Sequence, residues 1–96
     1  MKNDVNLEVV LSAITDKKVM LNFLKDITTP KEFEALQERL NVVFLLNKGL
    51  SYSEIAKKTG TSTTTITRVA RFLNNELYGG YRWVVKNIFN KNENEK

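Results

Sequence analysis

The stretch SYSEIAKKTGTSTTTITRVARFL, residues 51–73, decides the fold class of this chain. Ser51 is a good helix N-cap, and Glu54 three residues later completes the pattern of a capping box. Gly60 falls where the backbone has to turn, at a position where a positive φ favours glycine. Apolar residues then recur at helical spacing and are expected to face a core: Ile66, Val69, Ala70 and Leu73. The stretch predicts two short helices joined by a tight turn, a helix-turn-helix over about residues 51–74.

The opposite face of the second helix carries side chains that can enter the major groove of DNA. These side chains are polar or basic: Thr63, Thr64, Thr67, Arg68, Arg71 and Asn74. Ser62 or Thr61 can cap the helix, and Ser62 is also expected to contact DNA. Lys57 and Lys58 end the first helix, and with the two arginines they are suited to phosphate contacts. The face therefore predicts a DNA-reading helix.

An ordinary helical hairpin with a solvated polar face is the alternative interpretation of the same stretch. A plain hairpin does not require Ala56, Gly60 and Ile66 at this spacing along the chain. It also does not require a polar face with so few charged residues on its second helix. The helix-turn-helix is favoured for that reason.

The charge distribution points to the same half of the chain. Residues 1–47 hold six Lys/Arg and seven Asp/Glu, whereas residues 48–91 hold eight Lys/Arg and two Asp/Glu. Since phosphate neutralisation contributes much of the free energy of DNA binding, this basic half favours double-stranded DNA as a partner.

Several functional classes find little support in the composition. The chain has no Cys, which excludes disulfides and thiolate chemistry, and no His, which is the commonest general base and metal ligand. The carboxylates Glu32, Glu34 and Glu38 lie where helix-start and solvated roles suffice. No signal pattern and no apolar run of roughly 20 residues occurs. We expect a cytoplasmic protein that is not an enzyme, takes no cofactor or metal, and has no membrane partner.

The remaining residues predict further helices. A first helix is expected over residues 5–14, buried on more than one side, and a second, capped by Thr15 or Asp16, to about residue 25. Thr29 and Pro30 predict the start of a long helix that runs to residue 47 or 48. Its first half is amphipathic, with three residues expected to point inward: Phe33, Leu36 and Leu40.

The second half of the long helix favours a dimer. Residues 42–46, VVFLL, are apolar all the way round, and a chain of 96 residues has few neighbours to cover them. We therefore expect an intertwined or closely packed homodimer, with this helix and residues 5–25 at the interface.

The C-terminal part is expected to complete one domain over residues 1–90. Gly79-Gly80 reads as a helix stop, and residues 81–89 as a short amphipathic helix that closes the core, in preference to an aromatic segment that stacks on bases. The polar residues 91–96 are expected to be disordered.

Three motifs follow one another along the chain in a specific order and spacing. They are Thr29-Pro30-x-Glu32-x-Glu34-Ala35-Leu36-x-x-Arg39, then, after a long apolar helix, Ser51-x-x-Glu54, and Gly60-x-x-x-x-Thr65-Ile66-Thr67-Arg68. With the Gly79-Gly80-Tyr81 segment, this pattern resembles the tryptophan repressor superfamily, and most closely its YerC/YecD branch. The resemblance covers about residues 16–85. It implies an all-α, six-helix fold with a helix-turn-helix in an intertwined homodimer, and threonines 63, 64 and 67 near base edges.

The resemblance also implies a pocket. Arg39 and Arg68 match the two arginines between which the tryptophan repressor holds its corepressor. Val69 stands where that repressor has a glycine and Phe72 where it has a serine, so both add bulk and Phe72 removes a hydroxyl. We therefore expect no tryptophan binding. Arg39 and Arg68 are then surface or phosphate-binding arginines, in preference to a retained ligand site, and the effector, if one exists, is unknown.

Two functions remain open at this point. The favoured one is a DNA-binding transcription regulator of the bacterial repressor type, acting as a homodimer with one recognition helix in each half-site. The alternative is a protein-interaction module that docks on a partner such as a polymerase subunit.

Overall fold

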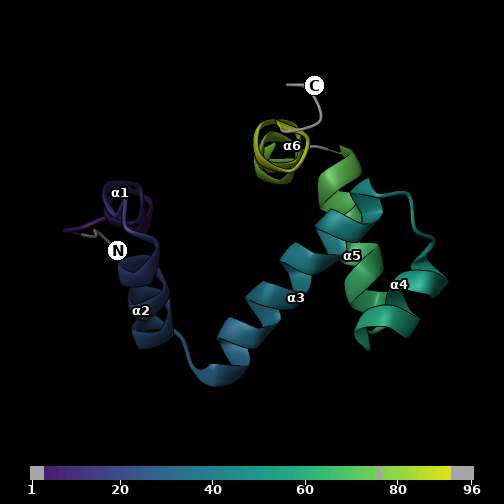
Figure 1. Cartoon of the computed structure of the whole chain (residues 1–96), viewed down its shortest axis with the longest axis horizontal. Coiled ribbons are helices and arrows are strands. Elements are labelled where there is room, and N and C mark those ends of the chain that lie inside the picture. Colours follow the sequence, from purple (N-terminus) through teal and green to yellow (C-terminus); the bar gives the residue numbers. More distant parts are fainter. Residues whose placement is uncertain (1–3, 76, 92–96) are drawn as a thin grey trace. The chain divides into compact units, whose positions relative to one another are not determined.

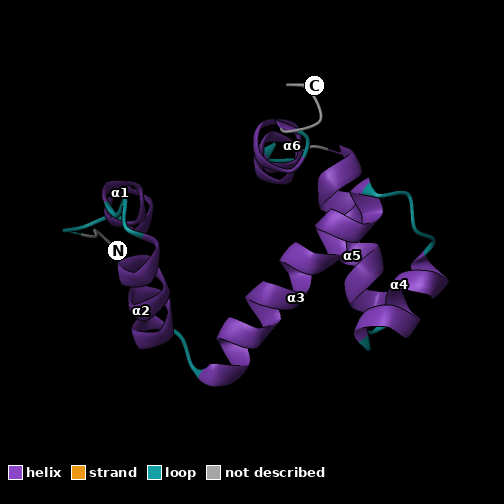
Figure 2. Ribbon diagram, viewed as in Figure 1, coloured by secondary structure: helices purple, strands orange, loops and turns teal. Residues whose placement is uncertain are grey.

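The computed structural model describes residues 4–75 and 77–91 of the chain. All regular structure in this part is helical, as the sequence predicted (Figure 2). The elements are α1 (Leu7–Ala13), α2 (Lys17–Ile27), α3 (Pro30–Asn47), α4 (Tyr52–Thr59), α5 (Thr63–Asn75), α6 (Gly80–Val84) and a π-helical turn η1 (Val85–Phe89) (Figure 1). They form two compact units, residues 1–34 and 35–96, whose boundary lies inside α3.

Side-chain caps fix the starts of four helices, α2, α3, α4 and α5. The Asp16 carboxylate accepts from the amide of Val19 at 2.9 Å, so Asp16 and not Thr15 caps α2. At α3 the Thr29 amide donates to Glu32 at 2.8 Å, and the Glu32 amide donates back to the Thr29 hydroxyl at 3.1 Å. The same reciprocal pair occurs at α4, as described below. Each cap satisfies amides that the first helical turn leaves without partners.

The first unit buries none of the residues of α1 and α2 within one chain. Helix α1 is also shorter than predicted, because Asn6 and Ile14 on either side of it have extended backbone conformations. The expectation of a helix over residues 5–14 that is buried on more than one side is therefore wrong for the single chain. Large apolar side chains stay exposed here instead, among them Val5, Leu7 and Val9.

The second unit contains the hydrophobic core. It is built from α3, α4, α5 and η1, whose buried members are Val42, Val43, Ile55, Ile66, Val69, Leu73 and Val85. Val42 and Val43 are completely buried by their own chain, so the expectation that a second chain is needed to cover them is wrong. Phe44 remains exposed on the same helix, with the Phe89 ring edge-on to it at 5.2 Å.

The C-terminal elements differ from the prediction in one respect. Gly79-Gly80 does not stop a helix: α5 ends at Asn75, Gly79 has φ +76°, and Gly80 is the first residue of α6. The predicted closure of the core is confirmed for η1, since Val85 is buried and the Asn90 side chain accepts a 2.8 Å hydrogen bond from Asn47. Lys91 is helical, and the rest of the tail predicted to be disordered lies outside the described residues.

Candidate nucleic-acid interface

The turn between α4 and α5 is held by hydrogen bonds on both sides of Gly60. Ser51 and Glu54 start α4 with the capping box predicted from the sequence, through bonds of 2.8 and 3.1 Å. Gly60 has φ +75°, and its amide donates to the Ala56 carbonyl at 2.9 Å, which ends α4. A left-handed residue at this place is the usual helix C-cap, and glycine adopts it at the lowest cost.

Thr61 ties this turn to α3. Its side chain is buried, with 3% of its surface exposed, and its hydroxyl donates to the Glu38 carboxylate at 2.8 Å. Its amide donates to the Thr59 hydroxyl at 3.1 Å. Sequence reasoning treated Glu38 as a solvated side chain and missed this contact. A threonine directly after the turn glycine offers only a weak signal, because the same residue also suits a helix cap.

Helix α5 is fixed in rotation by its apolar face. Ile66, Val69, Ala70 and Leu73 are all buried, as predicted. The Ser62 hydroxyl accepts from the Thr65 amide at 3.2 Å and donates to the Thr65 hydroxyl at 3.1 Å. Ser62 is therefore the cap of α5, which limits its part in any external contact.

The opposite face of α5 is exposed. Thr63, Thr64, Thr67, Arg68 and Arg71 all lie on it. Together with Phe72 they line one depression of about 560 Å³. The structure thus brings together the residues predicted on this face of α5, except Asn74, which is exposed and does not line the depression. Lys57 and Lys58 are exposed in the last turn of α4 and do not line this depression.

The threonine hydroxyls on this face have no partner within the described part of the chain. Elsewhere the hydroxyls of Thr28 and Thr59 donate to the carbonyl four residues earlier, at 2.6 and 2.7 Å. Thr67 has such a carbonyl available at Thr63 and does not use it. Helical threonines can make this bond. The hydroxyls of Thr63, Thr64 and Thr67 are therefore available to a ligand or to water.

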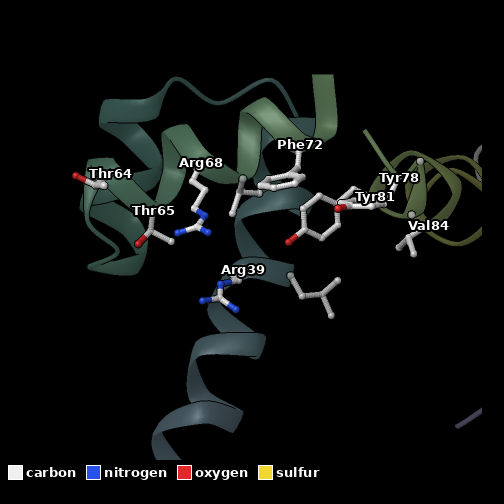
Figure 3. Close-up of a pocket in the computed structure, with 12 residues that line it drawn as sticks. Arg39, Thr64, Thr65, Arg68, Phe72, Tyr78, Tyr81 and Val84 are labelled. Carbon is white, nitrogen blue, oxygen red and sulfur yellow. The ribbon is translucent and has the colours of Figure 1, made fainter. Parts of the chain in front are cut away.

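A second depression lies between α3, α5 and the segment before α6. It has a volume of about 700 Å³. Arg39 from α3 and Arg68 from α5 reach toward the same space (Figure 3). Val69 and Phe72 form a wall of this pocket and leave it open. The two residues predicted to add bulk therefore lie at the pocket itself.

Tyrosines complete this pocket and were not expected from the sequence. Tyr78 and Tyr81 both line it, and the rings of Tyr78 and Phe72 stack with centroids 6.3 Å apart and planes at 12°. The signal that could have found them is their position on either side of Gly79-Gly80, where the chain turns toward α6.

The electrostatics of the interface are simple. Helix α5 contains two arginines and no Asp or Glu, so none of its side chains repels phosphate. Near the turn, the pKa of the Glu54 carboxyl is lowered, first because the Ser51 amide donates to it and then because of the Ser51 hydroxyl. Within the described residues, no cluster of His, Cys, Asp or Glu could hold a metal ion.

No helix in the described part of the chain combines the length and the apolar character that crossing a bilayer requires.

Comparisons with known proteins agree with this geometry. The family model described as Trp repressor protein matches residues 4–88. A curated protein of Bacillus subtilis (strain 168), which bears the name uncharacterized protein YerC, is 38% identical over 68 residues, or 69% of this chain. The chain spans about 65% of the length of that relative. No solved structure matches the chain. The chain belongs to the Trp repressor protein family.

Proposed function

We propose that this protein is a sequence-specific DNA-binding transcription regulator that inserts α5 into the major groove. The observation that carries the proposal is the outward face of α5, where exposed threonines with unused hydroxyls lie beside two arginines. Membership of the Trp repressor protein family supports it. Such a regulator would act in the cytoplasm, where bacterial DNA lies.

We call the exposed face of α5, with Thr63, Thr64, Thr67, Arg68 and Arg71, the reading face. Phosphate contacts are assigned to the basic side chains on it and near it. Arg71 lies two turns into α5, and Lys57 and Lys58 lie at the end of α4, all of them exposed. Their charges would place the protein on the duplex without selecting a sequence. Arg68, which borders both depressions, would share this role with Arg39.

A homodimer is part of the proposal. The support comes from apolar side chains that one chain leaves exposed on α1, α2 and the first half of α3, including Leu36 with 46% and Leu40 with 42% of their surface exposed. The first unit alone leaves several large apolar residues exposed, among them Val5, Leu7, Val9 and Val19, and exposed apolar surface of this kind often marks an interaction site. A second copy would cover them and would place two recognition helices on a two-fold symmetric site.

Sedimentation velocity tests the dimer. Leu36→Lys adds a charge to the exposed apolar surface, whereas Gln37→Lys adds the same charge at the next, polar position of α3. The proposal expects a dimer for the wild type and for Gln37→Lys, and a shift toward monomer or unfolded chain for Leu36→Lys. A wild-type monomer at all concentrations would refute this part.

We further propose that tryptophan does not control the protein. This proposal does not rest on a lack of space, because the pocket has a volume of about 700 Å³. The reason for the proposal is chemical: at Phe72 the wall offers a phenyl ring in place of a hydroxyl, so a polar ligand group facing it would lose a hydrogen bond.

A gel shift with pooled genomic fragments, at low and at moderate salt, tests the function. Retention of a few fragments at moderate salt, with or without added tryptophan, is the expected result. Retention only with tryptophan would refute the proposal about the pocket. The absence of any shift at low salt would refute DNA binding and favour a protein-interaction module that docks on a partner such as a polymerase subunit.

A further inference from the structure

We infer that the threonines of α5 recognise the C5-methyl groups of thymines, so that each half-site presents A·T pairs to the first turns of this helix. The inference rests on the proposed function, in which α5 enters the major groove. It goes further by naming the bases and the atoms that Thr63, Thr64 and Thr67 would contact.

The first turns of α5 lack the side-chain groups that usually identify guanine, adenine or cytosine. Recognition helices contact base edges mainly with their N-terminal residues. In α5 these are residues 63–67, TTTIT, which contain no amide, guanidinium, ammonium or carboxylate. Arg or Lys usually pairs with guanine, Asn or Gln with adenine, and Glu or Asp with cytosine. The first turns of α5 offer none of these pairings.

The second step is the chemistry that threonine offers. Each threonine presents a methyl group and a hydroxyl from the same Cβ atom. Among the four bases, only thymine presents a methyl group in the major groove, next to its O4 acceptor and the N6 donor of the paired adenine. One threonine can therefore place its methyl against the thymine methyl while its hydroxyl bonds O4, N6 or a bridging water.

Three threonines of α5 are exposed and oriented so that they can make this contact. The side chains of Thr63, Thr64 and Thr67 are exposed, and no hydroxyl among them is bound to another described residue. Ile66, which is completely buried, fixes the rotation of the helix between them. Threonine is also branched at Cβ, which restricts its side-chain rotamers in a helix. Each methyl group is thus presented from one of two main positions.

Arg68 and Arg71 limit the part of α5 to which the thymine preference applies. Arg68 and Arg71 follow the threonines along α5, and both line the same depression. Their guanidinium groups suit guanine or phosphate. The thymine preference is therefore confined to the base pairs that face the first turns of α5.

The experiment uses the full chain and duplexes with about 20 random base pairs, enough for two half-sites one helical turn apart. Sequences selected from this pool are remade with deoxyuridine in place of thymidine, one position at a time. Uracil keeps the pairing and the O4 atom and lacks only the methyl group. At positions contacted by threonine, affinity should fall about threefold to fivefold for each methyl, as expected for one buried methyl-sized group.

Matched variants assign the effect to a side chain. Thr67→Ser removes the methyl and keeps the hydroxyl, whereas Thr67→Val keeps methyl groups and removes the hydroxyl. Because Thr67 is exposed, both variants should fold, which circular dichroism can check. Thr67→Ser should abolish the difference between thymine and uracil at one position in each half-site, and Thr67→Val should retain it.

The outcomes separate this inference from the proposed function. Selective binding that ignores the thymine-to-uracil change at every position would overturn the inference and leave a sequence-specific regulator. Selection of half-sites without A·T pairs would do the same. The absence of selective binding would overturn both.

Discussion

The buried hydroxyl of Thr61 and the carboxylate of Glu38 are joined by a hydrogen bond of 2.8 Å across 23 residues of sequence. Thr61 is the first residue after the turn glycine, and α5 begins two residues later. The bond therefore attaches the segment that starts α5 to α3. Its partners belong to neither depression, so their role is to position α5.

Removing this bond should loosen the turn. Thr61→Val keeps the shape of the side chain and leaves the Glu38 carboxylate without its donor, so the free energy of unfolding should fall by about 1–2 kcal/mol. Urea denaturation measures the change. Thr61→Ser keeps the hydroxyl and should cost less. Effects of Thr61→Val and Glu38→Ala that simply add in the double variant would show that the two side chains are not coupled.

Substituting alanine at Gly60 and at Gly80 allows the free-energy cost of a positive φ to be measured against a matched control. A Cβ atom added at either residue would meet no atom within 4 Å, so crowding is absent at both. Gly60 has φ +75°, which costs an alanine about 1–2 kcal/mol. Gly60→Ala should lower the thermal midpoint, whereas Gly80→Ala, in the first turn of α6, should leave it unchanged or raise it. Equal effects would contradict this account of the turn.

The capping box of α4 should respond to acid. Because the pKa of Glu54 is lowered in the folded chain, its contribution to stability is present above the ordinary pKa of an exposed glutamate. It is lost as the pH falls through the lowered value. Glu54→Gln keeps an acceptor and does not titrate, so this variant should show a flatter decrease in thermal midpoint between neutral and acidic pH. An identical pH profile for wild type and variant would argue against the assignment.

Salt dependence should identify the phosphate contacts. Arg71→Ala removes a charge from the reading face, so binding should weaken by a similar factor on selected and on random duplexes, with a smaller slope of log K against log salt. Fluorescence anisotropy at several salt concentrations measures both. Lys25→Ala removes the same charge from the last turn of α2 and should leave the slope unchanged. A changed sequence preference with an unchanged slope would assign Arg71 to a base instead.

Local signals predicted the helix starts well. The pairs Thr29–Glu32 and Ser51–Glu54, and the positive φ of Gly60, depend on residues within one turn of each other, so the sequence contains all that decides them. The apolar period of α5 likewise predicted its buried face. The length of α1 was overestimated, because apolar content without a cap does not define where a helix begins.

Contacts between distant segments could not be predicted in the same way. Glu38 lies 23 residues before Thr61 in the sequence, and only the packing of α3 against the turn brings its carboxylate to the Thr61 hydroxyl. The pocket depends on three separate segments, so Tyr78 and Tyr81 have no local signature of their own. The burial of Val42 and Val43 similarly depends on how α4, α5 and η1 fold back on α3.

The continuity of α3 across the boundary between the two units matters for any attempt to dissect the protein. A fragment that starts at residue 35 begins in mid-helix, without the cap formed by Thr29 and Glu32. Its first four amides would have no helical partners, and a new end of this kind frays. Glu38 lies within that frayed turn, so trimming at the unit boundary would also loosen the anchor of Thr61. A minimal DNA-binding fragment should therefore retain residues 28–34.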